Sequence, residues 1–395
     1  MSSRSSGSPS SGTRSARPRV MVVYGTRPEA IKLATVVREL QRSATVEVTV
    51  VVTGQHRAML DQVNTLFGIV PQHDLDIIRP RQQLHEVTHR VLAGLTEVIR
   101  AERPSALVVQ GDTTTSFVAG LAAFYEQVPV VHVEAGLRTD NRYDPFPEEI
   151  NRRLTSQLSS LHLAPTPTSR DNLLREGIAP ADVVVTGNTV IDALLDVVSR
   201  RLPVADPAVA ALDGRRCVLV TSHRRESWGQ PMARTAAAVG RLAKEFDDVA
   251  FLLPAHLNPT VREVLLPPLE GLPNVTVTDP LSYGDFARAM DASTLILTDS
   301  GGVQEEAPSL GKPVLVLRET TERPEAVEAG TVRLVGTDEH LIVEQTRLLL
   351  TDPDAHDEMA RATNPYGDGL ASGRIRAAVE EFLGVGTRLP EWGEG

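Results

Sequence analysis

The chain has 395 residues and a formal net charge of −11, with 41% hydrophobic and 23% charged residues. This length accommodates about two domains, and no apolar run reaches the roughly 18 residues of a membrane span, so we expect a soluble protein. An acidic chain is a poor general binder of nucleic acid, so any phosphate site must be local. Cys217 is the only cysteine, which excludes an internal disulfide and a cysteine-rich metal site.

The first 17 residues consist mainly of Ser, Gly, Arg and Pro. They lack the apolar core of a secretory signal. They also cannot bury enough surface to offset the entropy lost on ordering. We therefore predict a disordered leader at residues 1–17 and a cytoplasmic protein.

Buried strands alternate with helices from residue 18 to about residue 200. Such alternation is typical of a doubly wound parallel sheet, so we predict an N-terminal Rossmann-like domain over residues 18–200. The strands are predicted at residues 19–25, 46–52, 106–110, 128–133, 161–164 and 183–185.

Charged residues follow several of these strands, at the edge where open α/β sheets bind ligands. Arg27 and Lys32 come directly after the first strand, and they are either solvated charges or a cationic pair for a ligand. Asp112 follows the third predicted strand and is either a helix cap or a site carboxylate. Glu134 follows the fourth.

A further carboxylate lies on the next predicted helix, where Glu148 and Arg152 are four residues apart on one face. They form either a surface ion pair of little worth or part of a site. Like charges close together resist ionisation, so Asp112, Glu134 and Glu148 suit proton transfer better than simple binding.

The second half of the chain repeats the alternation after a proline-containing linker at residues 202–214. We predict a second Rossmann-like domain over residues 201–372, with Cys217 buried and inert in its first strand. A last helix, within residues 373–388, is expected to pack back on the first domain. The strands are predicted at residues 217–221, 251–253, 275–277, 294–298 and 313–317.

The DSGG sequence at residues 299–302 joins the strand at 294–298 to a helix predicted at 303–310. It is either an ordinary tight turn or a phosphate site, because free backbone N–H groups and the helix dipole both favour an anion there. Glu306, about one turn into the helix, is then placed to accept hydrogen bonds from a ribose diol.

His223 and Arg323 also follow strands of the second half, which suits that domain to a nucleotide diphosphate. Two α/β domains place their strand ends across a cleft, where small ligands usually bind. The chain lacks a P-loop, a Gly-x-Ser-x-Gly elbow and a His-Glu-x-x-His motif. No Gly-x-Gly-x-x-Gly follows the first strand, which argues against a nicotinamide cofactor.

Ten sequence blocks resemble those of the non-hydrolysing UDP-N-acetylglucosamine 2-epimerases, in the same order and over about residues 19–385. The resemblance implies an α/β fold of two Rossmann-like domains facing a central cleft, the B-type glycosyltransferase fold. The blocks are GTRPEAIKLA (25–34), TGQHRAMLDQV (53–63), GDTTTS (111–116), HVEAGLRT (132–139), PFPEEINRRL (145–154), TGNTVIDAL (186–194), TSHRRESWG (221–229), PAHLNPTVRE (254–263), TDSGGVQEEAPSLGKPVLVLRETTERPEA (298–326) and NPYGDG (364–369).

The implied reaction is reversible inversion of C2 between UDP-GlcNAc and UDP-ManNAc. The family eliminates UDP to an enzyme-bound 2-acetamidoglucal and adds it back while C2 is reprotonated from the opposite face. The resemblance implies no metal or redox cofactor, a homodimer, and a pathway of cell-surface polysaccharide or antibiotic sugar synthesis.

The resemblance also assigns roles residue by residue. Asp112, Glu134 and Glu148 match the essential carboxylates, and His223 matches the histidine that helps UDP leave. The substrate contacts implied are Arg27, Lys32 and Arg152 as positioning cations, Phe286 at the uracil, Ser300, Gly301 and Gly302 at the phosphates, Glu306 at the ribose and Arg323 as a further nucleotide contact.

Some bacterial members bind a second UDP-GlcNAc as an allosteric activator. Gln55, His56, Arg81 and His256 fit that pattern, whereas Ala58 departs from it. Three other functions stay open: a hydrolysing relative that releases ManNAc and UDP, a glycosyltransferase of the same fold, and a non-catalytic nucleotide-sugar sensor. The intact set of carboxylates favours the epimerase.

Overall fold

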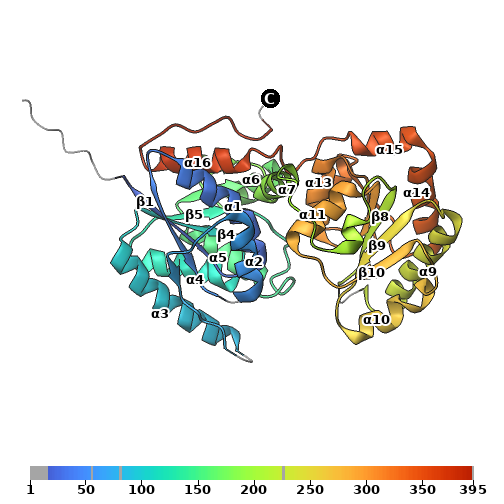
Figure 1. Ribbon diagram of the computed structural model, residues 1–395. Coiled ribbons are helices and arrows are strands. Elements are labelled where there is room, and N and C mark those ends of the chain that lie inside the picture. Colours follow the sequence, from blue (N-terminus) through green and yellow to red (C-terminus); the bar gives the residue numbers. More distant parts are fainter. Residues whose placement is uncertain (1–16, 55–56, 80–81, 225–226, 394–395) are drawn as a thin grey trace, which may run out of the picture.

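The computed structural model describes residues 17–393, except for 55–56, 80–81 and 225–226. Two parallel sheets, each flanked by helices, form two lobes side by side (Figure 1). The predicted α/β class with two Rossmann-like units is therefore confirmed. The predicted disordered leader lies outside the described residues apart from Arg17. Among the helices of the described ranges, none combines the length and the apolar character that crossing a membrane requires.

The first sheet has seven strands, and its order is β3-β2-β1-β4-β5-β6-β7. All of its strand pairs are parallel. β3 was not predicted, because a strand of two residues is too short to show a pattern. The strands are β1 (Arg19–Tyr24), β2 (Glu47–Val52), β3 (His73–Asp74), β4 (Ala106–Gln110), β5 (Val130–Val133), β6 (Leu161–Ala164) and β7 (Val183–Val185).

Alternate side chains of these strands point to opposite faces, and each face is covered by helices. Val20 and Val22 belong to the apolar cluster that includes α1, α7 and the last helix. Met21 and Val23 belong to the cluster formed with α3 and α4. The helices of this lobe are α1 (Arg27–Arg42), α2 (Arg57–Phe67), α3 (Leu84–Glu102), α4 (Thr114–Tyr125), α5 (Glu148–Leu158), α6 (Pro167–Arg175) and α7 (Thr189–Ser199), with a 3-10 turn at Pro180–Asp182.

The second sheet has six strands, and its order is β10-β9-β8-β11-β12-β13. Cys217 is buried in its first strand, as predicted. The strands are β8 (Cys217–Thr221), β9 (Ala250–Pro254), β10 (Val275–Thr278), β11 (Leu295–Thr298), β12 (Val314–Val316) and β13 (Val332–Leu334). The helices are α8 (Pro207–Ala210), α9 (Gln230–Glu245), α10 (Pro259–Leu265), α11 (Tyr283–Ala292), α12 (Gly301–Glu306), α13 (Pro324–Glu328), α14 (Glu339–Thr351) and α15 (Pro353–Ala360), with 3-10 turns at Pro267–Leu269 and Ala307–Leu310.

The last helix, α16 (Ala371–Phe382), returns to the first lobe and lies along α1 (Figure 1). The Ser372 hydroxyl is 2.8 Å from the hydroxyl of Thr35 in α1. The Ser372 N–H donates to the Asp192 carboxylate in α7 at 2.7 Å. The chain therefore crosses between the lobes twice, once before β8 and once before α16.

Candidate active site

Helix α1 begins at the carboxyl end of β1 and carries the first two predicted site residues. Thr26 caps this helix, and Glu29 completes a capping box. Lys32 lies one turn farther along and reaches across to the carboxylate of Glu134. Burial lowers the pKa of Lys32, but the carboxylates of Glu134 and Glu305 outweigh burial and the pKa is raised. Lys32 is thus a partly buried ammonium that stays charged.

Glu134 follows β5 and receives three hydrogen-bond donors. Its Oε1 accepts from Lys32 Nζ and, at 3.2 Å, from Asn188 Nδ2. Its Oε2 accepts from Gln110 Nε2. The backbone φ of Glu134 is +60°, which is uncommon for a residue with a side chain and is typical of functional positions. The fold therefore holds this carboxylate firmly in one place.

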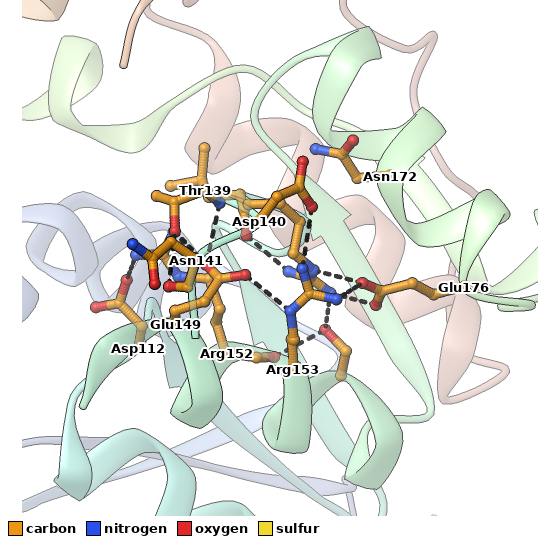
Figure 2. Close-up of polar contacts among 12 residues, drawn as sticks. Asp112, Thr139, Asp140, Asn141, Glu149, Arg152, Arg153, Asn172 and Glu176 are labelled. Carbon is orange, nitrogen blue, oxygen red and sulfur yellow. Dashed lines mark hydrogen bonds and ion pairs between the residues drawn. The ribbon is translucent and has the colours of Figure 1, made fainter. Parts of the chain in front are cut away.

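Asp112, after β4, faces the guanidinium of Arg152 on α5 at 2.5 Å (Figure 2). Burial raises the pKa of Asp112, while the charge of Arg152 opposes that rise. The alternative that Asp112 caps a helix is wrong, because the cap of α4 is Thr113. Asp112 is free of that role and belongs to the charged cluster at the sheet edge.

Arg152 does not pair with Glu148, contrary to the ion pair considered from their spacing. It contacts Asp112 and, at 3.4 Å, the fully buried Glu149. Glu149 also accepts from Arg153 Nε at 2.8 Å, as Figure 2 shows. Glu148 is partly exposed in the first turn of α5. Among the contacts of the described residues it has no hydrogen bond or ion pair, so its carboxylate is available to a ligand.

On the second lobe, His223 follows β8 and is held in place by the carboxylate of Asp299. The His223 and Arg224 N–H groups donate to the fully buried Asp299 carboxylate at 2.9 and 3.1 Å. His223 Nδ1 is 3.2 Å from the same carboxylate, while half of its side chain stays exposed. Burial raises the pKa of Asp299, but the bonds from His223 and Arg224 outweigh burial and the pKa is lowered. Asp299 is thus an ionised anchor that orients His223.

The glycine turn opens α12 directly at Gly301, with Ser300 as the cap. The predicted helix at residues 303–310 is therefore two elements, an α-helix over Gly301–Glu306 and a 3-10 turn over Ala307–Leu310. A Cβ on Gly301 would lie 2.9 Å from Arg323 Cζ, so only glycine lets the guanidinium approach the turn. Arg323 is held there by Glu305, with Nε 2.8 Å from Oε1.

Glu306 is buried beside the turn, and Tyr283 donates to its Oε1 at 3.3 Å. Burial, together with the neighbouring Glu305 carboxylate, raises the pKa of Glu306 to about 8. Phe286 lies on the same helix as Tyr283 and packs, partly buried, against the apolar core.

A cavity of about 580 Å³ lies beside these residues, between the lobes. Arg27 lines it together with Leu66 and Leu202 on one side and Tyr283 on the other. Burial lowers the pKa of Arg27, and the nearby Tyr283 and Glu306 counter that effect. Arg27 of the first lobe therefore lies close to the ribose candidate Glu306 of the second lobe.

The profile of one protein family extends over most of this chain. The model for UDP-N-acetylglucosamine 2-epimerase matches residues 38–380. The chain belongs to the UDP-N-acetylglucosamine 2-epimerase family. Family membership supports UDP-GlcNAc 2-epimerase activity.

Individual relatives agree with this assignment. The UDP-N-acetylglucosamine 2-epimerase of Bacillus subtilis (strain 168) is 51% identical over 365 residues, which cover 92% of this chain and 95% of that protein. The one from Escherichia coli (strain K12) is 50% identical over 375 residues, covering 92% and 98%. The crystal structure of the Neisseria meningitidis epimerase bound to UDP-GlcNAc is 48% identical, has a TM-score of 0.82, and covers 93% of this chain and all of that one. These neighbours share the predicted B-type glycosyltransferase fold.

Most residues that fit the allosteric pattern of the family lie outside the described residues. Gln55, His56 and Arg81 lie outside the described residues, as does the side chain of Ala58. His256 is exposed before α10, and its Nδ1 accepts from the Asn258 N–H at 3.1 Å.

Several residues of the site were missed from the sequence. Glu149 precedes Arg152 by three positions and Arg153 by four, so helical spacing alone could have found it. Asp299 directly follows a buried strand, and the same kind of position led to the prediction of Asp112. Asn188 and Glu305 lie 117 residues apart in the chain, and no local pattern indicates that they meet.

Proposed function

We propose that this protein interconverts UDP-GlcNAc and UDP-ManNAc without hydrolysis, by eliminating UDP and adding it back. One observation carries the proposal. The Glu134 carboxylate of the first lobe, which lies near Asp112, is linked through Asn188 to Glu305 of the second lobe. Glu305 in turn pairs with Arg323, which packs against the glycine turn. The N. meningitidis relative binds UDP-GlcNAc, and we extend that ligand to this chain.

The chemistry requires a base and an acid on opposite faces of the sugar. In the elimination, a carboxylate takes the C2 proton, a C1–C2 double bond forms, and the electron pair of the C1–O bond leaves with UDP. In the return step, UDP attacks C1 while a carboxyl group delivers a proton to the other face of C2. Glu134 is fixed by three donors, Asp112 has a raised pKa, and the Glu148 carboxylate has no partner among the described residues. These are the unlike environments that acid and base need.

The second lobe supports departure and retention of UDP. Arg323 lies against Gly301, so its charge and the N–H groups of the turn face the same place. His223 is held from its Nδ1 side by Asp299 and is exposed on the other. Donors fixed in advance stabilise the charge that develops on the leaving diphosphate. We assign the phosphates to this turn and the ribose to Glu306.

Proton NMR of UDP-GlcNAc with the protein in D2O, without an acceptor, tests the proposal. Growth of a UDP-ManNAc anomeric signal with deuterium at C2 is the expected result. Accumulation of free ManNAc and UDP would identify a hydrolysing enzyme and contradict the proposed retention of UDP. No change in the nucleotide sugar would refute the epimerase and point to a transferase or a sensor.

A further inference from the structure

Asn188 is the point where carboxylates of the two lobes meet. Its side-chain amide donates to Glu134 Oε1 at 3.2 Å and to Glu305 Oε2 at 3.2 Å. The residue is 4% exposed. It stands at the start of α7, which packs against α11 and α12 of the second lobe and lies at the junction of the lobes (Figure 1). One small side chain thus contacts both halves of the site.

Each carboxylate forms an ion pair with a cation of its own lobe. Glu134 pairs with Lys32 on the first lobe. Glu305 pairs with Arg323, whose guanidinium lies against Gly301 in the glycine turn. A continuous chain of polar contacts therefore runs from the Lys32 ammonium to the Arg323 guanidinium, which packs against the turn assigned to phosphate.

The remaining bonds of Asn188 fix which way its amide points. Its Oδ1 accepts from the Val190 N–H at 3.1 Å and so caps α7. Its own N–H donates to the Tyr366 carbonyl at 2.7 Å, in the segment that carries the chain back to the first lobe. Because Oδ1 is used by the helix, Nδ2 must face the two carboxylates.

These roles explain why an amide is needed at this position. Serine and aspartate are comparable helix caps. Serine is too short to span the two carboxylates, and aspartate would place a third negative charge between them. A helix cap alone therefore does not require asparagine, whereas a bridge between two carboxylates requires its N–H groups.

We propose that Asn188 is a positioning residue that couples the Glu134 carboxylate to the phosphate-binding turn. Nucleotide bound at Arg323 then biases the placement of Glu134, and by reciprocity the state of Glu134 changes the affinity for nucleotide. The inference rests on the proposed function in one respect, namely that Glu134 acts on the sugar.

The kinetic test compares Asn188→Ser and Asn188→Asp, with Asn258→Asp as the matched control. Asn258 caps α10 in the same manner, and among the described residues it contacts no carboxylate of the site. We expect kcat to fall about 10-fold in Asn188→Ser and about 100-fold in Asn188→Asp, since a misplaced carboxylate loses the benefit of orientation. In Asn188→Asp the acidic limb of the pH–rate profile should also move to higher pH, because an added negative charge disfavours the ionised form of a neighbouring catalytic carboxylate.

A binding test needs no turnover, so it stays informative even if the epimerase proposal fails. UDP affinity is measured by calorimetry for the wild type, Glu134→Gln, Asn188→Ser and the double variant. We expect Glu134→Gln to change the UDP Kd about fivefold in the wild-type background and little in the Asn188→Ser background, as coupled sites do.

Three results would overturn the coupling. The first is a kcat of Asn188→Ser within twofold of the wild type, together with an unshifted pH–rate profile of Asn188→Asp. The second is an additive binding cycle, whatever happens to kcat. The third is an equal kcat loss in Asn258→Asp, which would show that replacing the asparagine of any helix cap has the same effect.

Discussion

Glu306 gives the sharpest test of the electrostatics of the second lobe. Its pKa in the folded protein is about 8, raised from 4.5 by burial and by Glu305. Between these values the folded carboxyl keeps its proton while the unfolded one ionises, so the stability of the fold decreases as pH rises through this window. A rise of this size corresponds to about 5 kcal/mol, since one pKa unit is about 1.4 kcal/mol.

The substitution Glu306→Gln removes this titration and keeps an oxygen that can accept from Tyr283. We expect the unfolding temperature of the wild type to drop, relative to the variant, by about 10 °C between pH 5 and pH 8, at roughly 2–4 °C for each kcal/mol. Differential scanning calorimetry across that range measures it, with the exposed Glu328→Gln of the same lobe as control. Parallel curves for wild type and Glu306→Gln would refute the reasoning.

Three further outcomes follow from named contacts. Asp112→Asn should lower kcat about 100-fold or more while UDP affinity measured by calorimetry stays the same, and a kcat within tenfold of the wild type would contradict its role. Gly136→Ala should lower the free energy of unfolding in urea by roughly 3 kcal/mol or more, because the φ of Gly136 is +92° and the new Cβ would lie 2.1 Å from the Ser169 carbonyl oxygen. The control is Gly177→Ala, where φ is +88° but a Cβ would meet no atom within 4 Å, so the loss should be only about 1 kcal/mol. Trp392→Ala removes an indole N–H that donates to a main-chain carbonyl at 3.2 Å, so the unfolding temperature should drop by about 2–4 °C with unchanged kcat.

Most of the fold could be predicted from the sequence because its signals are local. Apolar runs such as residues 19–25 end at charged or glycine-rich turns, and both features survive in a single sequence. The predicted positions of Lys32 and Glu134 at strand ends were enough to expect a shared site, and the structure pairs them.

The partners within the site could not be predicted in the same way. Spacing suggested Glu148 as the partner of Arg152, yet the helix turns the guanidinium toward Asp112 and Glu149. Which of two adjacent glutamates lies inside depends on how α5 is rotated against the sheet, and packing against α4 sets that rotation. The resemblance named Asp112, Glu148 and Arg152 but gave none of these pairings.

The two crossings of the chain constrain how the lobes can move. Two bodies joined at two points rotate about the line through those points more readily than they separate. Asn188 donates to Tyr366 in the second crossing, so it lies close to that line. Contacts near a rotation axis change least in length as the lobes open. We therefore expect the bridge from Glu134 to Glu305 to change little in length during any rotation of the lobes about that line.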